Sequence, residues 1–172
     1  MGNKNQDTTT RALIVIPNED FQDESLNRFG AKMDEVEIIT HIAAPLKKTC
    51  TGMLGSKIEP DFALLTVDPA IYAALFFVGG EGTKNLWEDY LAISLAQTFD
   101  FAKKYIFACN TAPMILARAQ LLKQRKATCA EAYRSELENM GAEYVSDHVA
   151  FDQNILTGQG SPICDEFIKK AV

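Results

Sequence analysis

Residues 104–118 constrain the fold of this chain more than any other stretch, and they read KYIFACNTAPMILAR. The first part, residues 105–109, is a short apolar run typical of a buried parallel strand. The second part, from about Thr111, is rich in helix formers, and Pro113 is tolerated only near the start of a helix. Asn110 and Thr111 must therefore make a tight turn from a strand into a helix.

The residue at the tip of this turn decides what chemistry the chain can perform. A strand-to-helix turn can hold a strained nucleophile at the N-terminus of a helix, where a thiol has a lowered pKa and is reactive. Within the stretch the thiol is Cys109, and Asn110 follows it. If Cys109 belongs to the core strand instead, it is a small buried hydrophobic residue without a chemical role.

Other apolar runs predict further strands, with helices between them. Runs at residues 11–16, 36–40 and 74–78 predict buried strands. The other predicted elements are a helix containing Phe21, Leu26 and Phe29 and capped by Gly30, a small hairpin within residues 43–68, helices over 89–103, 130–140 (stopped by Gly141) and 164–171, and short strands over 126–129, 145–151 and 154–157, the last two flanking a turn at Asp152 and Gln153. Apolar strands that alternate with helices imply an α/β fold, with a mostly parallel sheet covered on both faces.

Length and composition limit the class of protein. With 172 residues, 47% of them hydrophobic, the chain predicts one domain over residues 11–172 after a disordered polar tail over residues 1–10. The net charge of −6 argues against a nucleic acid or an anionic membrane as partner, and no apolar run approaches the ~20 residues of a membrane span. Four cysteines without paired spacing predict reduced thiols in the cytoplasm, and two histidines make a metal site improbable, so we expect no cofactor. The cysteines are Cys50, Cys109, Cys129 and Cys164.

Three loops follow the predicted strands at the edge where parallel sheets bind ligands. They cover residues 17–22, 79–82 and 110–112. Gly79 and Gly80 either present backbone N–H groups to an anion or oxyanion, or simply make a tight turn. The acidic residues near these loops either supply an acid to the site or form a solvated helix start. They are Glu19, Asp20, Asp23 and Glu24. The aromatic residues Trp87 and Tyr90 either line a pocket or pack in the core.

Five motifs in order resemble the ThiJ/PfpI superfamily. They are NEDFQD at residues 18–23, the pair Gly79-Gly80, the turn before Pro113, LLKQRKAT at residues 121–128 and NILT at residues 154–157. The resemblance covers about residues 11–170 and implies a flavodoxin-like three-layer sandwich related to class I glutamine amidotransferase domains. It also implies a protease, amidase, glyoxalase- or deglycase-like enzyme, a chaperone or a stress sensor, in most cases as a dimer or higher oligomer.

The catalytic pattern of that superfamily does not carry over residue by residue. Its cysteine, histidine and glycine before the proline align without a gap with Asn110, Thr111 and Ala112, and counting from Gly79-Gly80 gives the same register. The glutamate of the first loop aligns with Gln22, and the late arginine of some members with Gln159. Since an amide is neither a nucleophile nor a general base near neutral pH, covalent chemistry would be lost. The two amides, Gln22 and Asn110, could instead hydrogen-bond to each other, directly or through one water.

We therefore expect a ThiJ/PfpI-like cytoplasmic homodimer with a disabled hydrolase site. In this hypothesis Gln22, Gly79, Gly80, Asn110 and Thr111 form a pocket for a small molecule or peptide. The alternative is a local slip of one residue that turns Cys109 outward as the nucleophile of a hydrolase, amidase or deglycase. A third class, a redox sensor or stress chaperone, requires only a responsive thiol and an apolar surface.

Overall fold

The computed structural model describes residues 9–160, and a seven-stranded, mostly parallel sheet forms its centre. The strand order is β11-β12-β8-β7-β1-β3-β6, in which only β11 runs antiparallel to its neighbour. Most of the predicted tail, the predicted helix over residues 164–171 and Cys164 lie outside the described residues.

The elements of the main sheet and the helices that cover it have the following bounds. They are β1 (Arg11–Val15), α1 (Asp23–Glu35), β3 (Ile39–Ala44), β6 (Phe62–Ala63), β7 (Ala74–Phe77), α2 (Tyr90–Phe101), β8 (Tyr105–Cys109), α3 (Pro113–Arg118), β11 (Val149–Asp152) and β12 (Ile155–Gly158).

The remaining elements are short and lie around the sheet. They are β2 (Glu19–Phe21), β4 (Cys50–Gly52), β5 (Lys57–Ile58), β9 (Lys126–Ala127), α4 (Arg134–Asn139), β10 (Glu143–Tyr144) and the 3-10 turns η1 (Leu64–Thr66), η2 (Pro69–Ile71), η3 (Glu81–Leu86) and η4 (Glu131–Tyr133). Strands β2, β4 and β5 form a second sheet, and β9 pairs with β10.

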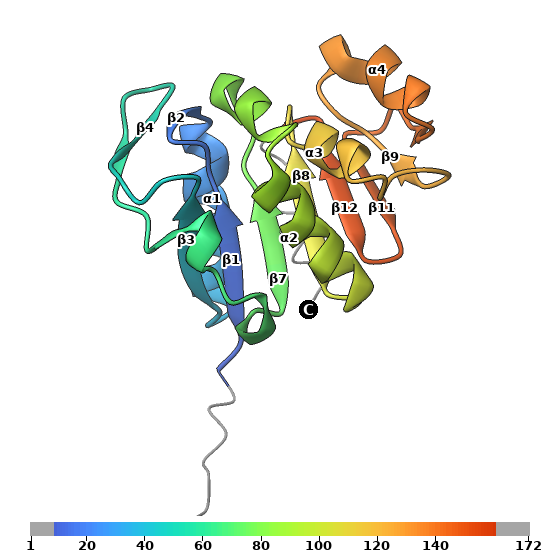
Figure 1. Cartoon of the computed structure of the whole chain (residues 1–172). Coiled ribbons are helices and arrows are strands. Elements are labelled where there is room, and N and C mark those ends of the chain that lie inside the picture. The colour runs from blue at the N-terminus through green and yellow to red at the C-terminus, as the bar shows by residue number, and fades with distance from the viewer. Residues whose placement is uncertain (1–8, 161–172) are drawn as a thin grey trace, which may run out of the picture.

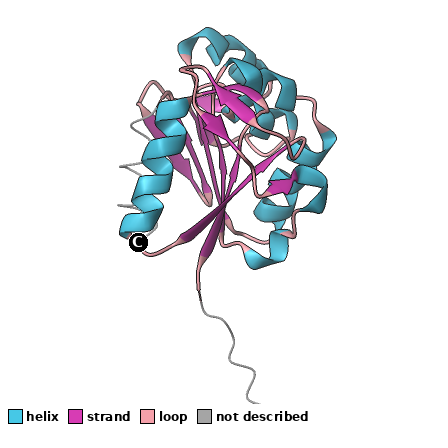
Figure 2. Cartoon of the chain, turned by 90° about the vertical axis from the view of Figure 1, so that its left-hand side faces the viewer, coloured by secondary structure: helices cyan, strands magenta, loops and turns pink. Residues whose placement is uncertain are grey.

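Helices cover both faces of the main sheet, so the expected three-layer α/β sandwich is confirmed (Figures 1 and 2). Helix α1 packs on one face, where Phe29 stacks on Phe76 of β7 with ring centroids 4.2 Å apart. Helices α2 and α3 pack on the other face, where Phe99 and Leu116 join Phe77 in a separate core cluster. Because side chains alternate along each strand, one apolar run supplies both layers of core.

The second predicted strand was misplaced, and the end of helix α1 explains why. The structure has β3 at Ile39–Ala44 rather than at residues 36–40. Helix α1 continues through Gly30 to Glu35 because Met33 extends its buried face. The next residues then terminate the helix: Glu37 adopts a left-handed φ of 57°, and the Ile38 N–H donates to Met33 O at 2.9 Å. Gly30 is therefore not the cap.

Other boundaries differ in smaller ways. Phe21 belongs to β2 and precedes α1. The predicted strand over residues 126–129 is reduced to the two residues of β9, and the helix over residues 130–140 divides into η4 and α4. Gly141 follows α4 with a φ of 92°, as a stop signal requires. The predicted hairpin is β4–β5, which pairs with β2 and not with the edge of the main sheet.

Within residues 9–160, no helix combines the length and the hydropathy needed to cross a bilayer. The same residues contain no group of three or more His, Cys, Asp or Glu side chains arranged to hold a metal ion.

Candidate functional site at the turn between β8 and α3

Three hydrogen bonds connect the three loops that follow β1, β7 and β8. The backbone N–H of Gln22, after β1, donates to Gly79 O at 2.8 Å. The hydroxyl of Thr111, after β8, donates to Gly80 O at 2.8 Å and accepts from the Gly80 N–H at 3.1 Å. Because β1, β7 and β8 are adjacent and parallel, their carboxyl ends meet at one edge, and the loops converge there.

Asn110 lies at the tip of the turn between β8 and α3. Its φ is 60°, in the left-handed region that asparagine tolerates better than most residues. Its N–H donates to Gly158 O and its carbonyl accepts from the Ala130 N–H, both at 2.9 Å. A Cβ added to Gly79 would lie 2.7 Å from Cβ of Asn110, so only glycine allows this approach. The backbone of the turn is therefore held from both sides.

Cys109 lies one residue earlier, at the end of β8, with 0% of its surface exposed. It packs with Phe107 in the core cluster on the α1 face of the sheet. Burial raises the pKa of the Cys109 thiol, although hydrogen bonds from the Gly79 backbone and the Ser25 side chain act in the opposite direction. A buried thiol of raised pKa is a poor nucleophile.

Gln22 is the N-cap residue of α1 and faces Ser25. The Ser25 hydroxyl donates to Oε1 of Gln22 at 2.7 Å, and Ser25 is fully buried. Within the described residues no hydrogen bond joins the side chains of Gln22 and Asn110, so the direct contact between the two amides is not formed. Sequence reasoning missed Ser25, whose only signal was its position three residues after Gln22 in the first helical turn.

The N–H group of Gly80 is directed at a protein atom in this structure. The Gly80 N–H donates to the Thr111 hydroxyl at 3.1 Å. Gly80 has a φ of 133°, and its Cβ would lie 2.3 Å from Asp20 O. Of the two interpretations of Gly79-Gly80, these contacts favour the tight turn and not the open anion cradle.

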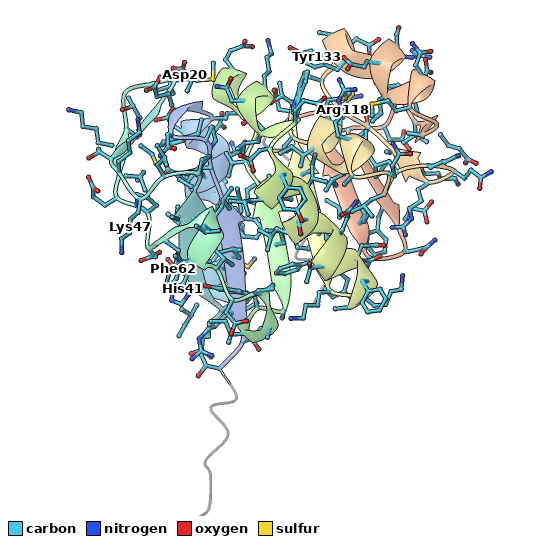
Figure 3. The ribbon with its side chains drawn as sticks, in the orientation of Figure 1. Asp20, His41, Lys47, Phe62, Arg118 and Tyr133 are labelled. Atoms are coloured by element: carbon cyan, nitrogen blue, oxygen red, sulfur yellow. The ribbon has the colours of Figure 1, made fainter. Side chains whose placement is uncertain are left out.

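An aromatic and charged rim surrounds the turn. The Trp87 indole N–H donates to Thr111 O at 3.0 Å, and the Tyr133 ring packs edge-on against Trp87, with centroids 5.2 Å apart. Arg118 pairs with Glu88 and Glu136. Figure 3 shows Tyr133, Arg118 and Asp20 at the end of the molecule where β1, β7 and β8 finish. Trp87 therefore packs against Tyr133 and positions the turn through its hydrogen bond to Thr111 O.

Tyr90 and Gln159 lie apart from that packing. The Tyr90 side chain is 79% exposed. The side-chain amide of Gln159 contacts His148 Nδ1 at 3.2 Å and Tyr144 OH at 3.3 Å. Gln159 thus belongs to a hydrogen-bond chain beside the turn. The residue that contacts Asn110 is its neighbour Gly158, whose carbonyl accepts from the Asn110 N–H.

The acidic residues near the site have separate roles. Asp23 is buried, and its carboxylate accepts from the Leu54 N–H at 2.8 Å and the Ser56 N–H at 3.1 Å. Burial alone would raise the pKa of Asp23, but the hydrogen bonds from Ser56 and Leu54 outweigh it and lower the pKa. Asp23 therefore anchors the β4–β5 hairpin to α1. Glu24 forms an exposed pair with Arg28 at 2.9 Å.

Comparison with known proteins identifies the class. The sequence model of the DJ-1/PfpI family matches residues 10–172. An uncharacterized protein of Methanocaldococcus jannaschii is 35% identical over 152 residues, which cover 87% of this chain and 74% of that protein. The protein/nucleic acid deglycase 2 of Escherichia coli is 26% identical, over 89% of this chain and 90% of the relative.

A solved structure supports the same assignment. The crystal structure of a ThiJ/PfpI domain protein from Brachyspira murdochii superposes with a TM-score of 0.89, at 27% identity, over 94% of this chain and 93% of that one. The chain belongs to the DJ-1/PfpI family.

Proposed function

We propose that this DJ-1/PfpI protein does not use the turn between β8 and α3 for cysteine-dependent hydrolysis or deglycation. One observation carries the proposal: the residue with the left-handed φ at the tip is Asn110, whereas Cys109 is buried in the preceding strand. An amide has no nucleophile comparable to a thiolate. Gln22, in the loop after β1, cannot ionise and so cannot act as a general base near neutral pH.

In this proposal the same turn binds a small polar molecule or a peptide segment. Ser25 occupies only the oxygen of the Gln22 amide, and the Asn110 amide makes no side-chain hydrogen bond among the described residues. Each of these neutral amides offers N–H donors and a carbonyl acceptor, which suits a ligand that carries carbonyl or hydroxyl groups.

We also propose a cytoplasmic homodimer. Unpaired cysteines at positions 50, 109 and 129 support the reducing compartment, and the dimer rests on the resemblance alone.

The test is an activity assay on the native protein and on Cys109→Ala and Cys109→Ser. The substrates are a short peptide amide and a methylglyoxal-modified amino acid, which represent the hydrolase and deglycase alternatives. The proposal predicts no turnover that depends on Cys109. Circular dichroism of each variant shows whether the fold is retained, and the serine variant preserves the size of the side chain.

The alternative is a cysteine hydrolase, amidase or deglycase that uses Cys109, or a redox sensor or stress chaperone. The Escherichia coli relative, named a deglycase, favours the enzymatic alternative. Saturable turnover that both folded Cys109 variants lose would establish that alternative and refute the disabled site.

A further inference from the structure

We propose that the opposite end of the sheet carries a second site, which binds a small organic phosphate. A cavity of about 500 Å³ opens there, with walls from the start of β1, from η2 and from residues 103–105 at the start of β8. Its volume lies in the range of small-molecule pockets. It is separate from the turn at Asn110, which lies at the carboxyl end of β8.

The described residues that line the cavity carry charge of one sign. Every charged side chain among them is a cation: Arg11, Lys103 and Lys104. The other polar side chains of this described lining are hydroxyls, from two threonines and two tyrosines, and none is a carboxylate. The whole chain carries 23 acidic against 17 basic residues, so this segregation runs against its net charge of −6. Cations on low-dielectric walls attract anions.

The cations come from the start of β1 and from the two residues that precede β8. The Tyr105 N–H donates to Ala73 O at 3.3 Å, and the Ala73 N–H donates to Arg11 O at 2.8 Å. Arg11 and Tyr105 are thus two strand spacings apart, about 10 Å. Lys103 precedes Tyr105 by two residues and has a left-handed φ of 58°. In this proposal an anion in the cavity lies between Arg11, the first residue of β1, and Lys103, which precedes β8.

Lys104 is already ordered without a ligand. Its ammonium donates to Pro69 O at 2.8 Å and Ala70 O at 3.1 Å, and it lies 5.4 Å from the centroid of the Phe99 ring. A second cavity of about 330 Å³, lined in part by Ala70, Phe99 and Lys104, adjoins the first. Ordering a lysine in advance reduces the entropy lost on binding.

The lining selects the class of ligand. The exposed parts of Ile71 (47%) and Tyr105 (38%) add an apolar wall beside the cations. A phosphate ester fits both features, because its dianion needs more than one cation and its organic group needs an apolar surface. This inference does not depend on the function proposed for the turn at Asn110.

The probe is phenyl phosphate, titrated into the ¹⁵N-labelled full chain and followed by NMR at low salt, with inorganic phosphate and phenol as comparisons. We expect shifts confined to the amides of residues 71–73 and 103–105, and weaker binding of both comparison compounds. Arg11→Gln and Lys103→Gln should each weaken binding about two- to fivefold. Lys47→Gln, the same charge change in the β3–β4 loop, should leave it unchanged. Melting temperatures identify any variant with a damaged fold, and Arg11→Lys retains the charge.

Four results would overturn the site. One is the absence of shifts at about 10 mM phenyl phosphate, a concentration at which even a weak specific site fills. Another is equal weakening by Lys47→Gln, which would show unspecific attraction to cations. The third is equal binding of inorganic and phenyl phosphate, which would show that the apolar wall does not contact the ligand. If Lys103 merely stabilises the end of α2, Lys103→Gln will lower the melting temperature without weakening binding, and this too refutes the proposal.

Discussion

Placing a thiol at the tip of the turn tests the geometry of the site directly. Asn110→Cys introduces a partly exposed cysteine next to the native, buried Cys109. The left-handed φ of 60° suits asparagine better than cysteine, so the change should cost about 1 kcal/mol of stability. Asn110→Ser imposes the same strain without a thiol and serves as the matched control.

The expected rates follow from the thiolate fractions. Burial raises the pKa of the Cys129 thiol to about 12, which leaves a thiolate fraction of about 3 × 10⁻⁵ at a pH of about 7.5. A solvent-accessible thiol of ordinary pKa, about 8.5, has a fraction of about 0.1 at that pH. The introduced thiol should therefore react about three thousand times faster than Cys129, and Cys109 should remain slow.

The assay is a time course of alkylation by iodoacetamide, quenched with acid and resolved by peptide mass spectrometry. Fragmentation separates position 109 from position 110, which share a peptide. The double variant Asn110→Cys with Gln22→Glu then adds a carboxyl in the loop that converges on the turn and tests whether the new thiol becomes easily oxidised. An introduced thiol as inert as Cys129, or alkylation of the native Cys109 at the rate of an exposed cysteine, would refute this geometry of the turn.

Three further predictions concern the framework of the site. Phe77→Ala or Ile106→Ala should each destabilise the fold by about 2–5 kcal/mol in urea unfolding, because both side chains are fully buried, and losses under about 1 kcal/mol at both would contradict the core assignment. Asp23→Asn should cost about 1–3 kcal/mol at neutral pH. Folding lowers the pKa of Asp23, so its contribution to the free energy of unfolding is complete above the unfolded pKa of about 3.9. That contribution vanishes as the pH falls through the pKa of the folded state. If Asp23→Asn loses stability at acidic pH in the same way as the native protein, this role is refuted. Thr111→Val should cost about 1–3 kcal/mol because the buried Gly80 N–H and carbonyl lose their partner, whereas Thr111→Ser should recover most of that stability.

Much of the fold could be predicted from local patterns. The runs at residues 11–16, 74–78 and 105–109 became β1, β7 and β8, each within one residue of the prediction. Burial on both faces makes such strands apolar throughout, and this signal is visible in a single sequence. Helix α2 was equally clear because Leu91, Leu95 and Phe99 lie on one side of it. The structure adds an Asp89 cap, which accepts from the Ala92 N–H at 2.9 Å.

Long-range contacts explain what local patterns missed. Residues 36–38 look like a strand, yet they terminate α1 because Met33 packs in the core and keeps the helix intact beyond Gly30. The segment at residues 126–129 was predicted as a strand, but only its first two residues form β9, which pairs with β10 and lies outside the main sheet. Tertiary packing overrides propensity in both cases.

The order of residues by itself determined that Asn110 follows a core strand and precedes Pro113, so an amide had to occupy the turn. Only the tertiary structure decided that Cys109 faces α1, that Ser25 takes the oxygen of Gln22, and that the N–H of Gly80 is used by Thr111. The physical reason is that strand and helix signals act over a few neighbouring residues. The direction and partners of a polar group, in contrast, depend on segments brought together by burial of the sheet.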